Sequence, residues 1–265
     1  MSLATYYKDH WLAIEPERFA RYDEMFKLDD KRADRLLAPL ALAPGQTALD
    51  LGCGPGYVAA HLARIVGPGG HVHALDVNAD FVARARAVAA EAGVEKRVEV
   101  HHLTSERFPL ADATCDRALA KNVLEYVPDA GATLRELHRV LKPGGTLTAM
   151  DSDWAFVLIE PLTPDETREL FTAAAPAFRE PLIGRKLRAA FRRAGFRDVQ
   201  VDIAASADDK GFMRPIVENM LGYAKKFGTM SEARAAELGA KVESAIASGE
   251  YLGVLPQFVV RGVRP

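Results

Sequence analysis

Short apolar runs alternate along the chain with longer segments in which apolar residues recur every three or four positions. The first pattern is typical of strands buried on both faces, and the second of helices that cover such strands. The strand pattern occurs seven times, at residues 47–51, 71–77, 97–103, 117–122, 146–151, 197–203 and 257–263. This alternation predicts an α/β fold with a seven-stranded, mostly parallel, doubly wound sheet.

The helical segments begin and end at residues that suit helix termini. Asp129 can cap a helix that ends at the glycines of 142–145, and Gly93 follows another. Helices are predicted at 57–66, 79–92, 130–141, near 165–175 and at 183–194. Two further helical stretches lie outside this alternation, so we expect residues 1–265 to form a single domain with residues 1–45 as an N-terminal helical cover and residues 205–255 as a helical insertion that acts as a lid.

Composition limits the classes of partner. The 265 residues are 49% hydrophobic and carry a formal net charge of −2, which gives no general electrostatic reason to bind nucleic acid or an anionic membrane. No apolar run approaches the length of a membrane span, and the N-terminus lacks the pattern of a secretory signal. With only Cys53 and Cys115, the chain suits a reducing compartment. We expect a cytoplasmic monomer or homodimer.

A glycine-rich turn, in the stretch ALDLGCGPGYVA at residues 48–59, joins the first strand to the first helix. Such a turn can bring backbone N–H groups and a helix N-terminus against a nucleotide-like cofactor. Its glycines, Gly52, Gly54 and Gly56, follow G-x-G-x-G rather than the G-x-G-x-x-G of dinucleotide folds. Asp50 precedes them and would repel a diphosphate but attract an ammonium group.

At this point the chain resembles the class I S-adenosylmethionine-dependent methyltransferases, and especially the ubiquinone/menaquinone biosynthesis family. The resemblance rests on LDLGCGPG, ALDVNADF, VLEYVPD and VLKPGGTL, in the family's order across residues 45–150. The segment ARYDEMF at 20–26, which contains Tyr22, adds a match ahead of the first strand. The resemblance implies a Rossmann-like methyltransferase fold and S-adenosylmethionine as cofactor.

Carried over by position, the resemblance also implies the cofactor contacts. Asp50 and the backbone of the glycine loop would hold the methionine part, Asp76 would accept hydrogen bonds from both ribose hydroxyls, and Val77 and Phe81 would flank the adenine. Thr104 stands where the family has an acid for the adenine amino group. The full set of expected cofactor residues is Tyr22, Asp50, Gly52, Cys53, Gly54, Gly56, Asp76, Val77, Phe81, Thr104, Ser105 and Asn122.

The reaction site is expected at the ends of the fourth and fifth strands. Asn122 is favoured over Lys121 as its floor, because a lysine would repel the sulfonium; the alternative for Lys121 is a solvated loop side chain. Methyl transfer depends more on a dry, well-aimed site than on acid–base groups, although some acceptors need a base. The candidates for that base are Asp153, Asp151, His10 and Glu125. Asp151 and Asp153 could equally be capping or surface acids, and Trp154 a core residue.

Four histidines raise the question of a metal site. His71, His73, His101 and His102 fall on neighbouring predicted strands, but no carboxylate or cysteine is expected to complete a metal site, so no metal is predicted. The sequence therefore predicts methyl transfer from S-adenosylmethionine to carbon, oxygen or nitrogen of a small molecule, without nucleic acid. The alternatives are a protein of this fold that binds the cofactor for another purpose, and an RNA or protein methyltransferase.

Overall fold

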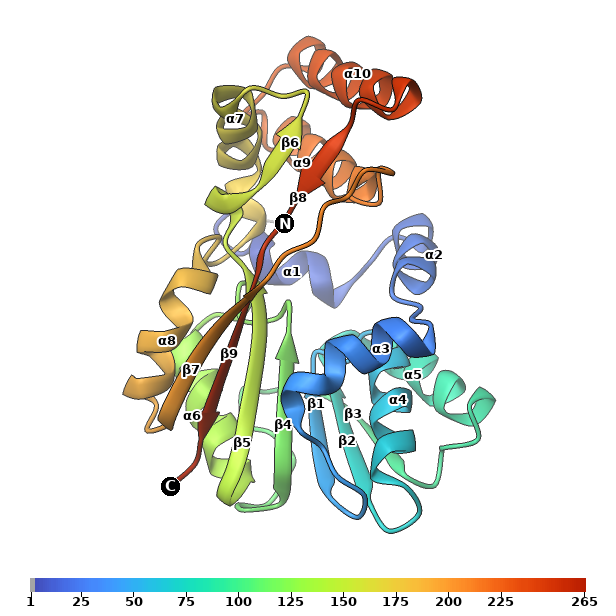
Figure 1. The fold of residues 1–265 in the computed structure, drawn as a ribbon, viewed down its shortest axis with the longest axis vertical. Coiled ribbons are helices and arrows are strands. Elements are labelled where there is room, and N and C mark those ends of the chain that lie inside the picture. Colours follow the sequence, from blue (N-terminus) through green and yellow to red (C-terminus); the bar gives the residue numbers. More distant parts are fainter. Residues whose placement is uncertain (1–2) are drawn as a thin grey trace.

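In residues 3–265, which the computed structural model describes, seven strands form one sheet (Figure 1). Strand β9 runs antiparallel to both of its neighbours, and the other strands are parallel. The prediction of a seven-stranded, mostly parallel sheet is confirmed. In spatial order the strands are β3 (Val98–His102), β2 (His71–Asp76), β1 (Thr47–Leu51), β4 (Cys115–Lys121), β5 (Leu141–Ser152), β9 (Gln257–Val263) and β7 (Arg197–Ala204).

Helices cover both faces of the sheet, which explains why its central strands carry buried apolar residues on both faces. In β1, Ala48 packs toward α4 and α5, whereas Leu49 and Leu51 pack toward the opposite layer of α6 and α8. Asp129 caps α6 as predicted, since its carboxylate accepts from the backbone N–H of Ala132. The bounds are α3 (Asp30–Leu37), η1 (Ala38–Leu40), α4 (Tyr57–Val66), α5 (Ala79–Glu91), α6 (Ala130–Val140) and α8 (Ile183–Arg193).

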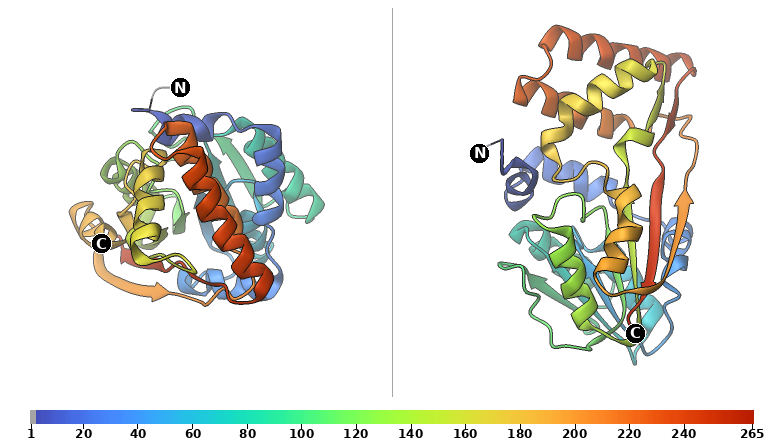
Figure 2. Two further views of the ribbon diagram at one scale, coloured as in Figure 1. Left: turned by 90° about the horizontal axis from the view of Figure 1, so that it is seen from above. Right: turned by 90° about the vertical axis from the view of Figure 1, so that its left-hand side faces the viewer.

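A cap with its own apolar core lies beyond the carboxyl ends of the parallel strands (Figures 1 and 2). It contains η2 (Trp154–Phe156), β6 (Leu158–Glu160), α7 (Pro164–Ala174), η3 (Ala175–Ala177), α9 (Arg214–Phe227), α10 (Glu232–Ser248) and β8 (Leu252–Val254). Two insertions therefore build the cap, whereas the sequence assigned only residues 205–255 to it and treated them as purely helical. The paired strands β6 and β8 were missed because three residues are too few to show a period.

The N-terminal cover lies between the sheet and the cap (Figure 1). The helices of the cover at this place are α1 (Tyr6–Leu12) and α2 (Pro16–Met25), which precede α3 and η1 in the chain. From α2, Asp23 accepts from Arg84 of α5, and Arg18 donates to the hydroxyl of Tyr223 in α9, so this cover holds the two layers together. Within residues 3–265, none of the helices has the length and apolar character needed to cross a bilayer.

Candidate functional site

Polar side chains gather where the parallel strands end beneath the cap. Asp50 of β1 and Asp76 of β2 alternate with residues that face the opposite layer, so both project on the side of α4 and α5. Lys121 ends β4 on the same side by the same alternation. The sheet therefore brings three groups that are distant in sequence to one edge, as the sequence predicted for Asp50 and Asp76.

Asp50 is buried and lacks a sufficient set of hydrogen-bond partners. Its exposed fraction is 3%, and its Oδ2 has no partner among the residues the structure describes. Burial, followed by the charge of Asp76, raises the pKa of this carboxyl from 3.8 to about 7. Because a buried polar atom without a partner is costly, this oxygen fits a ligand that donates a hydrogen bond or carries positive charge.

The N–H groups of the glycine loop point into the protein. Gly52 and Cys53 both donate to the carbonyl of Leu75, at 2.7 and 3.1 Å, and Gly56 donates to the carbonyl of Cys53. Gly54 donates to Oδ2 of Asp76 at 2.8 Å. In this structure β2 and the loop itself accept their hydrogen bonds, and the predicted contact of the loop backbone with the methionine part of the cofactor stays a prediction. The loop instead suits a ligand that needs no anion cradle.

Two of the three glycines are required by packing inside the protein. A Cβ on Gly52 would lie 2.3 Å from Cγ2 of Val123, and one on Gly56 would lie 2.7 Å from Cα of Ala85 in α5. All three adopt positive φ, and only Gly54 has ordinary contact distances, to the ring of Phe26. The close approach inferred from the sequence at Gly52 and Gly56 thus comes from the chain's own residues.

Asp76 retains room for a ligand beside its structural bonds. Its two carboxylate oxygens accept from the N–H groups of Gly54 and Asn78, at 2.8 and 2.9 Å. A carboxylate has about four lone-pair positions, so acceptor capacity for two hydroxyls remains. The predicted ribose contact of Asp76 stays a prediction that this geometry permits.

The adenine side is only partly enclosed. Val77 is 40% exposed, and Phe81 is buried against Phe19 of the N-terminal cover, with ring centroids 5.2 Å apart. Thr104 and Ser105 are exposed, and the Ser105 hydroxyl donates to the carbonyl of Arg107. The predicted adenine contacts of these residues stay predictions.

The alternative for Lys121, a solvated loop side chain, is wrong, because this residue ends β4 and is partly buried. Burial lowers its pKa, while the negative charges of Asp151, Asp50 and Glu125 raise it. Those carboxyls also offset the repulsion expected between this lysine and a sulfonium. The next residue, Asn122, has a positive φ of 53° and a buried Oδ1 without a partner in the described chain, as is common where a ligand is bound.

Glu125 and Asp151 lie next to this lysine and are buried. Glu125 accepts from the indole N–H of Trp154 at 2.7 Å, and Asp151 accepts from the backbone N–H of Leu124 at 3.2 Å. Burial is the main cause that raises the pKa of both carboxyls. Carboxyl groups whose pKa values are raised in this way are suited to proton transfer.

Asp153 is fully buried and already paired. Its carboxylate accepts two hydrogen bonds from the guanidinium of Arg185 and a third from the N–H of Ala155, where it caps η2. The arrangement favours the capping interpretation over a role as base. Trp154 packs in the cap core, on the rings of Phe171 and Phe178, while its N–H reaches Glu125.

His10 and Tyr22 belong to an aromatic cluster in the N-terminal cover. His10 is buried between Tyr6 and Trp11, with Nδ1 against the carbonyl of Tyr6 and Nε2 unpartnered within residues 3–265. Burial lowers its pKa to about 4, so the ring is neutral at pH 7. Tyr22 stacks on Trp11 and accepts from Arg18, and its predicted contact with the cofactor stays a prediction.

The statement that no carboxylate joins the strand histidines is wrong. In the parallel register of β2 and β3, His73 lies opposite Glu99, and the two side chains project on one face. Glu99 was missed because the sequence does not fix how neighbouring strands are aligned.

Comparisons with known proteins agree with this arrangement. Residues 49–149 match the Methyltransferase domain family. An uncharacterized 37.1 kDa protein in transposon TN4556 of Streptomyces fradiae is 34% identical over 193 residues, which are 68% of this chain and 52% of that protein. The ubiquinone/menaquinone biosynthesis C-methyltransferase UbiE of Klebsiella pneumoniae is 36% identical over 119 residues, 45% of this chain and 47% of the relative. The chain thus spans about half the length of these curated relatives.

Solved structures share the fold at low identity. A SAM-dependent methyltransferase from Aquifex aeolicus has a TM-score of 0.56 and 20% identity, over 93% of this chain and 99% of that one. The phosphoethanolamine N-methyltransferase 2 of Haemonchus contortus has a TM-score of 0.66 and 15% identity, over 100% of this chain and 60% of that one. The [4+2]-cyclase SpnF has a TM-score of 0.56 and 22% identity, over 89% and 81%.

Residues 49–149 thus match a methyltransferase domain, and the chain shares the fold of solved S-adenosylmethionine-dependent methyltransferases, the class whose cofactor is S-adenosylmethionine. Within the class it is similar to the ubiquinone/menaquinone biosynthesis C-methyltransferases, as its motifs predicted.

The substitution Asp50→Asn should weaken binding of S-adenosylmethionine by about tenfold or more, because a charge-assisted contact is lost. In the wild type, affinity should increase as pH rises through about 7, where this carboxyl ionises. Calorimetric titration between about pH 5.5 and 8.5 measures both effects.

The same variant should change stability in the opposite direction. The pKa of Asp50 is higher in the folded protein than its ordinary 3.8, so its contribution to stability is lost as pH rises toward about 7. Asp50→Asn should therefore unfold at a higher temperature than the wild type above neutral pH. The exposed Asp202 of β7 supplies the control variant Asp202→Asn, and an Asp50→Asn profile identical to it would contradict the assignment.

Proposed function

We propose that this protein transfers the methyl group of S-adenosylmethionine to carbon, oxygen or nitrogen of a small-molecule acceptor. The observation that carries the proposal is the buried carboxyl of Asp50, with an unpartnered oxygen, beside Asp76 at the carboxyl edge of the sheet. A cationic cofactor with vicinal hydroxyls would satisfy both groups. The test is formation of S-adenosylhomocysteine with a panel of phenols, amines and acidic carbon acceptors.

The residues of the chain would divide the cofactor between them. Asp50 would face its positively charged part, Asp76 its ribose, and Asn122 would lie under the reacting end. The bound cofactor supplies an electrophilic methyl group on a sulfonium. The chain contributes orientation and exclusion of water, which suits an in-line displacement whose positive charge disperses.

The aromatic cluster of the N-terminal cover would contact the acceptor in this proposal. His10 contacts the rings of Tyr126 and Tyr223, at centroid distances of 5.8 and 5.7 Å. Both His10 Nε2 and Trp11 Nε1 are buried without partners in the described part of the chain. Flat apolar walls with two unpaired polar atoms favour a small molecule that has an unsaturated or apolar body and a polar substituent. A large RNA or protein would need the cap and cover moved aside.

Where the acceptor must lose a proton, Glu125 is the preferred base. It lies between the cofactor edge and the cover, since its neighbour Tyr126 contacts Trp11, and burial raises its pKa. Asp151 is a second candidate, whereas His10 is a weak base because burial lowers its pKa to about 4. Asp153 is left out because Arg185 already neutralises it.

A second function follows from the same cofactor site. The fold is shared with a protein described as a [4+2]-cyclase, so the fold alone does not fix the reaction. The alternative is a protein that binds S-adenosylmethionine without transferring its methyl group. Binding of S-adenosylmethionine with no formation of S-adenosylhomocysteine from any acceptor would support it.

Asp76→Ala should lower cofactor affinity by at least about tenfold, with less effect on turnover at saturating cofactor. It removes two charge-assisted acceptors, each worth about 1.5–3 kcal/mol, and also the partner of the Gly54 N–H. Calorimetry with S-adenosylhomocysteine in the presence of a chelator measures the loss. Unchanged affinity, or binding of NADH in place of the homocysteine compound, would refute the site.

Glu125→Gln should reduce kcat. In the wild type the rate should rise with pH near the raised pKa of Glu125, about 7, and this rise should be absent in the variant. Cofactor affinity should change little. The matched variant Asp153→Asn also turns a buried acid into an amide, but should lower the unfolding temperature while it preserves kcat, since its partner is Arg185. Loss of kcat in the Asp153 variant alone would reverse these assignments.

We also propose that residues 205–255 and residues 1–45 close over the acceptor as a lid. The exposed link at 205–207 joins β7 to the cap, and α2 is tied to α9 by the 3.0 Å bond from Arg18 to Tyr223. A contact of this kind can open and reform as ligands enter and leave.

Elastase should cut the free protein at the alanines of 205–207, and S-adenosylhomocysteine with an acceptor should slow that cleavage. Tyr223→Phe keeps the ring but removes the hydroxyl bonded to Arg18, so it should make cleavage faster. Equal cleavage rates in the free and bound protein would argue against a closing lid.

A further inference from the structure

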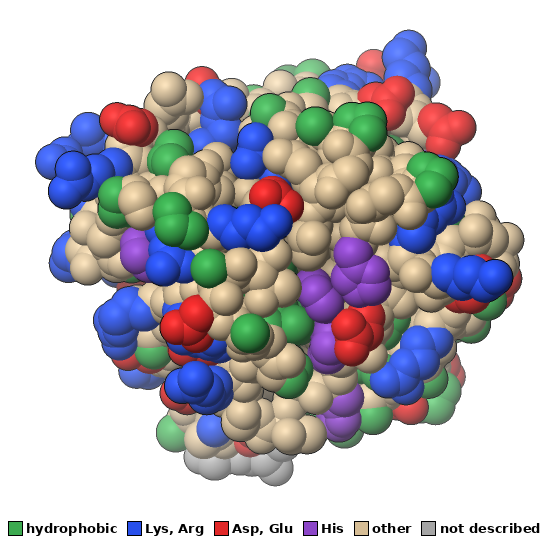
Figure 3. Space-filling view, turned by 90° about the horizontal axis from the view of Figure 1, so that it is seen from below, with side chains coloured by type: hydrophobic (Ala, Val, Ile, Leu, Met, Phe, Trp, Pro, Cys, Tyr) green, Lys and Arg blue, Asp and Glu red, His purple; other side chains and the backbone are tan. Residues whose placement is uncertain are grey.

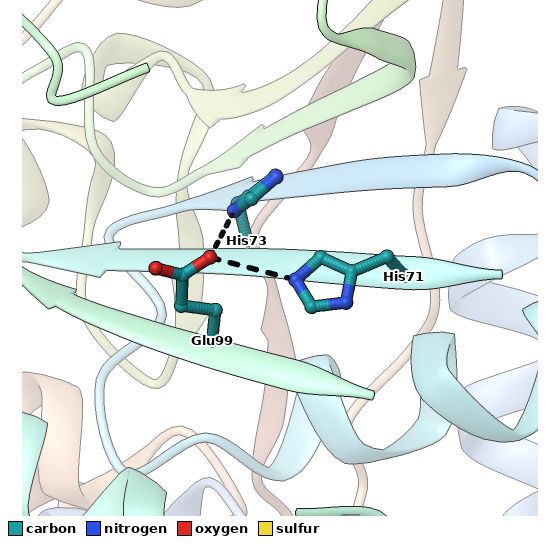
Figure 4. Close-up of side chains that lie close together, drawn as sticks. All are labelled: His71, His73 and Glu99. Carbon is teal, nitrogen blue, oxygen red and sulfur yellow. Dashed lines mark ion pairs between the residues drawn. The ribbon is translucent and has the colours of Figure 1, made fainter. Parts of the chain in front are cut away.

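Three histidines and a glutamate meet on the sheet face opposite α4 and α5, away from the cofactor edge. His71 and His73 project from β2, and Glu99 and His101 from β3. Figure 3 shows histidine side chains gathered beside an acidic side chain at the molecular surface seen from below, and Figure 4 shows Glu99 beside His71 and His73, paired with each. The proposed methyl transfer uses none of these residues.

Strand register and an exposed stretch of sheet explain the cluster. His71 and His73 are two residues apart and so share a face, and the parallel pairing aligns His73 with Glu99. The connection at 103–114 between β3 and β4 contains no helix, so this part of the sheet lacks the cover that α6 and α8 give elsewhere. The side chains therefore remain reachable, with exposed fractions of 37% for His71 and 57% for Glu99.

The separations between possible ligand atoms are those of a metal site. Oε2 of Glu99 lies 3.3 Å from Nδ1 of His73 and 3.6 Å from Nε2 of His71. Ligands at 2.0–2.1 Å in a tetrahedron around Zn²⁺ are about 3.3 Å apart. The ligand atoms of these three residues all lie within 4.8 Å of one another, and among the described residues theirs is the one such group.

We propose that His71, His73 and Glu99 bind a divalent transition-metal ion of the zinc class. His101 is a further donor, with Nε2 3.2 Å from Nδ1 of His73 and 3.7 Å from Oε2 of Glu99. Two or three imidazoles with one carboxylate suit Zn²⁺, Co²⁺ or Ni²⁺, whereas Mg²⁺ and Ca²⁺ prefer oxygen ligands alone.

The ion would fasten an edge of the sheet. Strand β3 pairs only with β2, and β2 ends three residues after His73 at Asp76, about 10 Å further along the strand. A metal bound to side chains of both strands would stabilise their pairing without contact with the cofactor. The site is thus expected to act on stability, and it does not depend on the proposed reaction.

The test is calorimetric titration of the full chain, without a polyhistidine tag and after chelation, with zinc chloride. The wild type should bind one ion, unfold at a higher temperature as free zinc increases, and ignore magnesium chloride. His73→Ala and Glu99→Gln should each weaken zinc binding by about tenfold or more. His102→Ala is the matched control, because His102 lies on β3, as Glu99 does, and contacts the carbonyl of Val77 instead of the cluster.

Thermal unfolding of each metal-free variant first establishes that the variant is folded. Glu99→Gln changes an exposed side chain, so it tests the site even if His73→Ala does not fold. The proposal is overturned if the folded wild type takes up no zinc, or if His73→Ala and Glu99→Gln bind it as tightly as His102→Ala does. Binding of S-adenosylhomocysteine by the chelated wild type should be unchanged, which separates failure of this site from failure of the cofactor site.

Discussion

An excess of buried negative charge at the carboxyl edge of the sheet is the constraint on which the site depends. Asp50, Glu125 and Asp151 lie around a single cation, Lys121, and burial raises the pKa of each carboxyl while it lowers that of the lysine. Ionised carboxylates in such surroundings are expensive without a counter-charge. A positively charged ligand lowers this cost. The charge of the whole cluster, rather than one particular contact, therefore favours a cation.

The glycine loop also favours a cation, because its backbone N–H groups donate within the protein. A dinucleotide cradle offers backbone N–H groups to phosphate, whereas the N–H groups of Gly52, Cys53 and Gly54 here donate to the end of β2. Two of the glycines serve packing, against Val123 and Ala85. With these loop donors engaged and a buried carboxyl nearby, the site suits an ammonium or sulfonium group better than a phosphate.

The sheet and its helices were predictable because each apolar run had a turn or a cap at its end. Asp129 and the glycines after β1 mark such boundaries without any knowledge of tertiary contacts. The environment of Lys121 was not predictable, because it depends on Asp50 and Asp151 from other strands. Glu99 was missed for the same reason, since register alone places it opposite His73. The pairing of Asp153 with Arg185 joins residues 32 positions apart and leaves no local signal.

The division between sheet and cap explains how one fold can support different reactions. The sheet edge carries the groups suited to the cofactor, and those lie in the segment that matches the methyltransferase family. The cap and the N-terminal cover, under which the acceptor is proposed to bind, lie outside residues 49–149. Arg18 joins these parts, since its guanidinium lies over the rings of Trp11, Tyr22 and Tyr223. Cation–π contacts tolerate an exchange of one aromatic ring for another, whereas a buried charge cluster tolerates the loss of an acid poorly. Substitutions among the rings around Arg18 can therefore alter the choice of acceptor while the cofactor site is kept.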